Sequence, residues 1–245
     1  MNKKLIIIFI SLALAFTTMA CSVCFFSLPA WGSGRLKKET RSISEFSSVQ
    51  VSGGIQLYFT QGKELKLEIE AEDNMLDLIE TRVRGKELHI GYKWGSMAFP
   101  TKPVIVNLTT DTLESIGLSG GSTFECDSLT SSELRIDISG GGDSSLQKVK
   151  VDSLELNLSG GSTTDISGKT EDLDINLSGG SGVKAKDLES ASAKVKISGG
   201  GKATIWVEKT LDANLSGGSN LYYYGSPKVT QNMSGGSDLI PEGEH

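Results

Sequence analysis

The chain has 245 residues and a formal net charge of −6, with 24 Lys and Arg against 30 Asp and Glu. This balance argues against nucleic acid or anionic lipid as a main partner, because both reward clustered basic side chains. Glycine is abundant at 29 residues and recurs at regular intervals, which argues against a disordered low-complexity tract.

Residues 1–31 have the features of an export signal. Two lysines precede a long run, from Leu5 to Gly34, that contains no charged residue. A positive start, an apolar run and small residues near Ala20 are typical of segments that direct export. Three outcomes are open: lipidation of Cys21 after cleavage, cleavage without a lipid, or retention as an uncleaved anchor. Each predicts an exported protein of the cell envelope, whether outer-membrane lipoprotein, periplasmic or surface protein.

Residues 32–118 predict strands in a less regular arrangement. Apolar and polar residues alternate, as in strands with one buried face, at 48–62, 66–71, 87–92 and 104–110. The segment 72–80 is compatible with one or two helical turns. We expect this part to form the irregular N-terminal coils and cap of a repeat structure, because a repeat fold needs its open ends covered.

Residues 119–240 contain a repeat with a period near 20 residues. Ser-Gly-Gly begins at Ser119, Ser139, Ser159, Ser178, Ser198, Ser216 and Ser234. Aliphatic residues mostly occupy the positions one, three and five before each serine, as at Leu154, Leu156 and Leu158, with polar residues between them. Apolar side chains also recur five and seven residues after the serine. A single coil cannot bury these side chains, so the pattern predicts stacked coils.

The predicted fold is therefore all-β, a parallel β-helix (solenoid) with one coil per repeat. A tight corner once per coil explains the glycine pair, since glycine adopts positive φ without a Cβ penalty. The predicted corner residues are Gly120, Gly121, Gly140, Gly141, Gly160, Gly161, Gly179, Gly180, Gly199, Gly200, Gly217, Gly218, Gly235 and Gly236. Residues 241–245 are predicted to be a polar tail.

The chain also resembles a bacterial family named putative auto-transporter adhesin, head GIN domain. The resemblance rests on segments 32–62, 67–83 and 86–93 and on the Ser-Gly-Gly coils, and it covers about residues 32–240. The Gly-Ile-Asn signature appears as Gly54-Ile55-Gln56, which departs at its third position. The resemblance implies a right-handed β-helix at the envelope or cell surface and suggests adhesion, and it brings no catalytic residues.

Few residues suggest chemistry. Cys126 is the only cysteine outside the leader, so a disulfide within the domain and a zinc site built on cysteines are excluded. Ser119 lies in a Gly-x-Ser-x-Gly match, yet it is one of seven equivalent corners and lacks a suitable histidine partner. We expect no catalytic residue, no metal site and no cofactor.

Outward-facing residues are expected to form columns along the stacked coils. Arg135 is predicted to pair with Glu155 of the next coil, and Lys194 with Asp174 and Asp212 on either side of it. Two positions before the serine, amides recur, which predicts amide ladders of mainly structural value at Asn157–Asn176 and Asn214–Asn232.

Three aromatic residues are the candidate ligand surface. Trp206 and Tyr224 each lie eight residues after their serine, so we expect them on adjacent coils, with Tyr222 on the same side. Exposed rings in a row suit a glycan or an envelope or host protein. The competing interpretation is that these rings shield the last coils.

Together these features predict a non-enzymatic envelope or surface protein, an adhesion or ligand-binding scaffold that contacts membrane only through its leader or lipid. One alternative is a polysaccharide-acting β-helix enzyme, although coils of 18–20 residues leave little length for the walls of a catalytic cleft. The other is a purely structural envelope protein. Ligand identity and oligomeric state are outside what these patterns predict.

Overall fold

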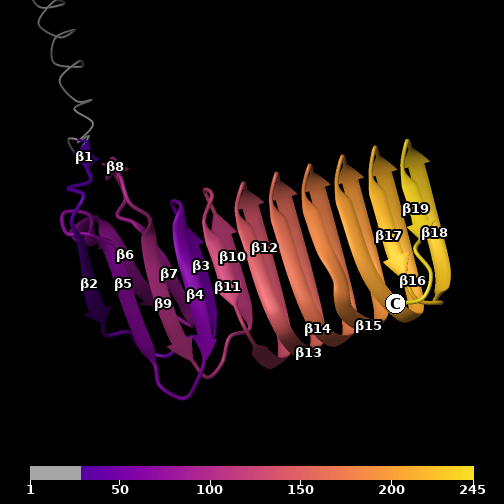
Figure 1. Cartoon of the computed structure of the whole chain (residues 1–245), viewed down its shortest axis with the longest axis horizontal. Coiled ribbons are helices and arrows are strands. Elements are labelled where there is room, and N and C mark those ends of the chain that lie inside the picture. Colours follow the sequence, from indigo (N-terminus) through magenta and orange to yellow (C-terminus); the bar gives the residue numbers. More distant parts are fainter. Residues whose placement is uncertain (1–28) are drawn as a thin grey trace, which may run out of the picture.

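A computed structural model describes residues 29–245 and shows an all-β protein, a right-handed parallel β-helix of stacked coils (Figure 1). The predicted fold class and the coil length of about 20 residues are confirmed. Residues 1–28, and with them the predicted lipidation site Cys21, lie outside the described residues. Within residues 29–245, no helix has the length and apolar character needed to cross a bilayer.

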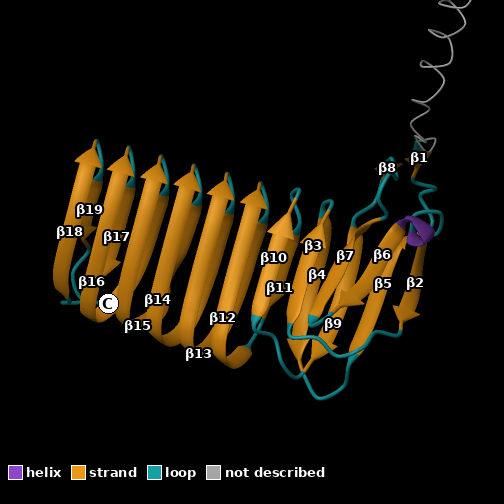
Figure 2. Ribbon diagram, turned by 180° about the vertical axis from the view of Figure 1, so that it is seen from behind, coloured by secondary structure: helices purple, strands orange, loops and turns teal. Residues whose placement is uncertain are grey.

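The regular coils are built from strands that each continue around most of a coil. These strands are β12 (Leu129–Gly140), β13 (Asp143–Gly160), β14 (Thr163–Gly179), β15 (Gly182–Gly199) and β16 (Lys202–Gly217). Each strand lies parallel to the next (Figure 2) and pairs with it at equivalent positions. Ser159 therefore lies between Ser139 and Ser178. The sequence repeat thereby becomes a spatial repeat of about 4.8 Å, the distance between neighbouring strands.

Each coil has three straight stretches, as strand β13 illustrates. Its buried side chains form three groups, Ser144 and Leu146, then Val149 and Val151, then Leu154, Leu156 and Leu158. Two consecutive exposed residues separate each group from the next, at 147–148 and at 152–153. Alternation across a straight strand forbids two successive residues on one face, so the chain must bend at these two places.

The interior is filled by the residues that the alternation predicts to face inward. Leu154, Leu156 and Leu158 are 0%, 0% and 2% exposed. The positions five and seven after the serine are buried as well, for example Phe124 and Cys126. Both parts of the pattern are confirmed. Each fully buried aliphatic side chain contributes about 1.5–3 kcal/mol to stability.

The N-terminal part has shorter elements. They are β1 (Ala30–Trp31), β2 (Leu36–Arg41), β3 (Ser48–Ser52), β4 (Ile55–Gln61), β5 (Lys66–Glu72), the 3₁₀ helix η1 (Leu76–Leu78), β6 (Ile79–Arg84), β7 (Glu87–Tyr92), β8 (Ala98–Phe99), β9 (Val104–Thr110), β10 (Ser115–Ser119) and β11 (Thr123–Cys126). The helical turns expected at 72–80 are reduced to η1, because Ile79 already begins strand β6.

The N-terminal coils do not stack in sequence order. Strand β3 pairs in parallel with β7 on one side and β10 on the other, and β4 lies in the same way between β9 and β11. The coil formed by β3 and β4 therefore lies between two coils that follow it in the chain (Figure 1). Antiparallel strands close this end, with β6 on β7, β5 on β9 and β2 on β5, and these strands form the irregular cap.

The C-terminal coils are short and more exposed. They consist of β17 (Asn220–Tyr224), β18 (Lys228–Gly235) and β19 (Asp238–Pro241). Strand β18 pairs with β16, and β19 pairs with β17. Met233 takes the inward position that Leu215 fills one coil earlier, but Met233 is exposed whereas Leu215 is buried.

The tight corner depends on the first glycine of each pair. Gly160 has a φ of +91°, a conformation that disfavours other residues, whereas Gly161 does not lie in the positive range. A Cβ atom on Gly160 would also lie 2.5 Å from the carbonyl oxygen of Gly140 in the preceding coil. Both glycines have positive φ at the corner of Gly120 and Gly121 and at the earlier corner of Gly53 and Gly54.

The serine after the glycine pair closes the corner, a role that the sequence analysis did not assign. The Ser181 hydroxyl donates to the Ser178 carbonyl oxygen at 2.9 Å, and Ser122 donates to Ser119 at 2.9 Å. Both hydroxyl-bearing residues are fully buried. The signal was present in the sequence, because five of the seven Ser-Gly-Gly corners continue with this serine.

The two glycines of one corner should respond differently to substitution. Gly160→Ala places a Cβ atom against the Gly140 carbonyl at a strained φ, so it should lower the free energy of unfolding by about 1–3 kcal/mol. Gly161→Ala meets no atom within 4 Å and should change it by less than about 0.5 kcal/mol. Urea unfolding followed by circular dichroism measures both, and equal effects would contradict the assigned corner geometry.

Candidate ligand groove

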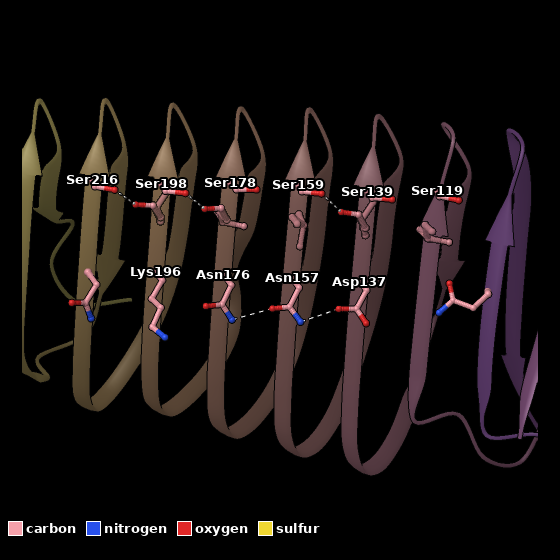
Figure 3. Close-up of a pocket in the computed structure, with 17 residues that line it drawn as sticks. Ser119, Asp137, Ser139, Asn157, Ser159, Asn176, Ser178, Lys196, Ser198 and Ser216 are labelled. Atoms are coloured by element: carbon pink, nitrogen blue, oxygen red, sulfur yellow. Dashed lines mark hydrogen bonds between the residues drawn. The ribbon is translucent and has the colours of Figure 1, made fainter.

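A shallow groove with a volume of about 640 Å³ crosses the regular coils. One side is the column of residues two positions before each serine, and the other side is the column of corner serines (Figure 3). The backbone of residues such as Leu158 lies between them, while the Leu158 side chain is buried in the interior. The groove therefore presents side-chain polar groups at the regular spacing of the coils.

Hydrogen bonds along the first column order part of it. Asn157 Nδ2 donates to Asp137 Oδ1 at 2.9 Å, and Asn176 Nδ2 donates to Asn157 Oδ1 at 3.0 Å. The predicted amide ladder thus forms between Asn157 and Asn176. No hydrogen bond joins Asn214 to Asn232, and Asn214 Nδ2 donates to Asp212 of its own strand at 3.0 Å.

Charge along the groove is sparse. Asp137 is the only acidic and Lys196 the only basic residue of the lining. Arg135, beside the groove, donates to Asp137 Oδ2 and to Glu155 Oε1, both at 2.7 Å, so the predicted Arg135–Glu155 pair is confirmed. The hydrogen bond to Asp137 raises the pKa of Arg135 further above its usual range. Asp137 thus has an ion-pair partner in Arg135, which leaves Lys196 as the charged residue of the lining without one among the residues that the structure describes.

The cross-coil pairs predicted for Lys194 do not form. Within residues 29–245 no carboxylate lies within the 4.0 Å ion-pair limit of its ammonium group. Asp174 instead accepts a hydrogen bond from Asn176 at 2.9 Å, and Asp212 accepts one from Asn214. Each of these two carboxylates is therefore hydrogen-bonded to an amide on the same face of its own strand.

The serine column is held only weakly by the protein itself. Ser159 and Ser198 hydroxyls donate to carbonyl oxygens of the preceding coil at 3.4 Å, and Ser216 does so at 3.5 Å. These are long for O–H···O bonds, whose usual range ends near 3.0 Å. The hydroxyls are consequently available to exchange these contacts for a ligand.

The groove is blocked near the N-terminal coils. Gly117 occupies the position of the amide column in strand β10, opposite Gln50 of β3. A Cβ atom on Gly117 would overlap the Gln50 amide group, so the Gln50 side chain lies over this glycine. The open part of the first column accordingly begins at Asp137.

The aromatic residues Trp206, Tyr222 and Tyr224 lie away from this groove. His245 stacks on Trp206 with ring centroids 4.3 Å apart and meets the Tyr224 ring edge-on at 5.3 Å. Tyr222 instead lies under the Lys202 ammonium, 4.5 Å from the ring centroid. The structure brings Trp206 and Tyr224 together but covers them with the chain's own tail, which favours the shielding interpretation.

Backbone hydrogen bonds fasten that tail. Gly225 N donates to Gly243 O at 2.9 Å, and Glu242 N donates to Tyr223 O at 2.9 Å. The His245 ring also lies 3.5 Å from Asp187 Oδ1. Residues 241–245, predicted as a polar tail, thus pack on the last coils.

Reactive chemistry has little support among residues 29–245. Cys126 is buried, and burial raises the pKa of its thiol to about 11, so the nucleophilic thiolate is scarce at neutral pH. No group of three or more His, Cys, Asp or Glu side chains in this range is placed to hold a metal ion.

Known proteins resemble the chain in sequence and in fold. The family model for putative auto-transporter adhesin, head GIN domain, matches residues 45–227. A putative adhesin from Bacteroides fragilis shares 21% identity with a TM-score of 0.81, covering 87% of this chain and 99% of its own. A putative adhesin from Parabacteroides merdae shares 22% identity with a TM-score of 0.75, covering 88% and 99%.

A third solved structure carries a different description. It is a putative lipid binding protein from Parabacteroides distasonis, with 19% identity and a TM-score of 0.75, covering 87% of this chain and 99% of its own. At such identities these structures establish the shared fold. No curated protein matches the chain.

The amide ladder should be sensitive to a single added charge. Asn157→Asp places a third carboxylate beside Asp137 and Glu155, so it should destabilise the protein by about 1 kcal/mol at pH 7. The neighbouring carboxylates raise the pKa of the new group in the folded state. The loss should therefore fade as the pH falls through that pKa and vanish below about 4.

Asn214→Asp is the matched control, because it also adds a carboxylate beside one on its own strand, Asp212, but its neighbour on the preceding coil is the cation Lys196. Urea midpoints of both variants between pH 3 and 7 measure the difference. A larger loss for Asn214→Asp, or a pH-independent loss for Asn157→Asp, would contradict the charge arrangement described here.

The tail contact is testable by fluorescence. In a protein whose only tryptophan is Trp206, deletion of residues 242–245 removes the stacked His245 ring and should shift the emission maximum to longer wavelength. Glu242→Ala, which keeps His245 and the backbone hydrogen bond of residue 242, should leave the maximum close to its original value. An unchanged spectrum after the deletion would show that the tail does not cover Trp206 in solution.

Proposed function

The chain belongs to the putative auto-transporter adhesin, head GIN domain family, and from that membership we propose that it is an exported, non-catalytic binding scaffold. Its ligand would be a linear polymer, a glycan of the envelope or of a host surface, laid along the groove between the two polar columns. The observation that carries this proposal is the groove itself, about 640 Å³ in volume and continuous over six coils from Ser119 to Ser216.

The shape of the groove supports an extended ligand. Backbone N–H and C=O groups of the regular coils already pair with the coils on either side, so the sheet face offers no free backbone for an added peptide strand. Recognition must come from the side chains. These repeat once per coil, a spacing that suits a ligand made of repeating units.

The chemistry of the groove supports a hydroxyl-rich ligand. Its lining consists mainly of amides and hydroxyls, which both donate and accept hydrogen bonds. Lys196 adds a single positive charge without a carboxylate partner in the described part of the chain. A polysaccharide with occasional acidic groups would satisfy both features.

The enzymatic alternative has weaker support. The one acidic residue of the groove, Asp137, accepts hydrogen bonds from Arg135 and Asn157. Hydrolysis of a glycosidic bond ordinarily uses a pair of carboxyl groups, and the groove lining contains only this one. Descriptions of the family and of the neighbouring structures name adhesins and a binding protein.

Blocking the groove tests the proposal. The protein is applied to an array of linear bacterial and host glycans, and affinity for any binder is then measured for Ser178→Trp. Ser178 is exposed at the middle of the serine column, so the indole would obstruct the groove and should weaken binding at least tenfold, or about 1.4 kcal/mol. Lys196→Glu should weaken binding of acidic glycans selectively.

The matched control is Lys184→Trp, an equally exposed position of strand β15 outside the groove lining. It should bind as the unmodified protein does. Failure to bind any glycan, or equal affinity for Ser178→Trp and Lys184→Trp, would refute the proposal. Depolymerisation of a glycan would favour the enzymatic alternative.

A further inference from the structure

The N-terminal end of the described chain carries a cluster of exposed apolar side chains, separate from the groove. Trp94 is 100% and Trp31 68% exposed, and Met97 and Phe99 are exposed as well. We call these four residues the apolar patch. They account for most of the seven exposed large apolar residues between 29 and 245. Such clustering indicates an interaction site, whereas single exposed apolar residues are ordinary.

Local structure brings Trp31 and Phe99 together and places Trp94 and Met97 in the segment just before Phe99. Strands β1 and β8 form a two-stranded parallel ribbon, with Ala30 N donating to Met97 O at 2.8 Å and Gly32 N to Phe99 O at 3.0 Å. The rings of Trp31 and Phe99 stack with centroids 4.9 Å apart. Trp94 lies in the turn just before β8, which a hydrogen bond from Ser96 N to Lys93 O closes at 3.0 Å.

A buried carboxylate, that of Glu72, helps to hold the ribbon to the β-helix. Glu72 accepts hydrogen bonds from Gly34 N at 2.6 Å, from Thr101 N at 2.8 Å and from the Thr101 hydroxyl at 2.6 Å. It thus joins the segment after β1 to the segment after β8. The hydrogen bond from Thr101 holds the pKa of Glu72 below its usual range. The patch is therefore fixed in place while its side chains stay in contact with water.

The position of the apolar patch in the chain brings it close to any membrane that holds the leader. The ribbon lies at the end of the molecule opposite the C-terminal coils (Figure 1). Strand β1 contains the last two residues of the predicted leader, Ala30 and Trp31, and the uncharged run that starts at Leu5 continues to Gly34. An extended chain covers at most about 3.6 Å per residue, so Trp31 lies within about 36 Å of Cys21. Any bilayer that holds the leader is therefore within reach.

We propose that the apolar patch is a membrane-docking surface, in which Trp31, Trp94, Met97 and Phe99 enter the interfacial region of the bilayer to which the leader directs the chain. Tryptophan favours that region because its ring is apolar while its N–H remains hydrogen-bonded. Lys93 and Lys102 are exposed beside the patch and suit the phosphates of the headgroups. The docked ribbon would hold the β-helix in one orientation relative to the membrane.

The three tryptophans of the chain provide the test, because Trp206 belongs to strand β16, which lies toward the other end of the β-helix (Figure 1). Three full-length proteins, each with one tryptophan and phenylalanine at the other two positions, are reconstituted into phosphatidylcholine–phosphatidylglycerol vesicles. Acyl-chain bromines near the headgroup quench only tryptophans within the interface. Emission of Trp31 and of Trp94 should fall about twofold relative to unbrominated vesicles, and that of Trp206 should not change.

A matched pair of variants separates docking from mere tethering by the leader. In the protein whose only tryptophan is Trp31, Trp94→Phe keeps the patch apolar, whereas Trp94→Glu adds a charge that opposes entry. Quenching of Trp31 should persist with Trp94→Phe and be largely lost with Trp94→Glu. Because Trp94 is fully exposed, neither change should unfold the protein, which circular dichroism verifies.

Two results would overturn the proposal. One is quenching of Trp31 and Trp94 no stronger than that of Trp206. The other is emission from Trp31 and Trp94 that is already shielded without lipid, which would mean that the leader or a second copy of the chain covers the patch. Both outcomes leave the glycan-binding proposal untouched, since the groove lies on other coils.

Discussion

Parallel pairing between successive coils is the constraint on which the rest of the structure depends. Residue pairs such as Leu156 with Ile175, and Ile175 with Val195, face each other across adjacent coils. An outward residue cannot shift by one position without turning every inward aliphatic residue of its coil toward water. The interior thereby fixes the register, and the register in turn places the amides and serines of the surface in straight columns.

The groove is a consequence of this same arrangement. Its floor is backbone that serves the packing of the coils, and only its two polar columns are free to vary. Lys196 occupies the column position at which other coils have an amide, and Gly117 occupies it without a side chain. The residues next to both positions remain apolar and buried. The buried positions of a strand thus determine the fold, and the exposed positions between them determine recognition. One scaffold can therefore carry different surfaces.

The regular coils were predictable from sequence because their information is local and periodic. Leu154, Leu156 and Leu158 show the inward face directly, and the Ser-Gly-Gly spacing shows the coil length. The sequence predicted the Asn157–Asn176 ladder but not the groove. The groove has a floor of backbone and is closed where the Gln50 side chain lies over Gly117, and neither feature produces a periodic signal in the sequence. Nor does sequence show that His245 covers Trp206, since that contact joins distant positions by tertiary packing.

The coil formed by β3 and β4 has a further implication, for the order in which the chain acquires structure. Both of its neighbours, β7–β9 and β10–β11, are made from residues 87–126, which follow it in the chain. During synthesis or translocation from the N-terminus, residues 48–61 emerge before either stacking partner exists. These residues must wait for long-range partners, whereas each later coil can add at once to a finished template. During such emergence, the β3–β4 coil is expected to gain both of its stacking partners only after residues up to 126 have appeared.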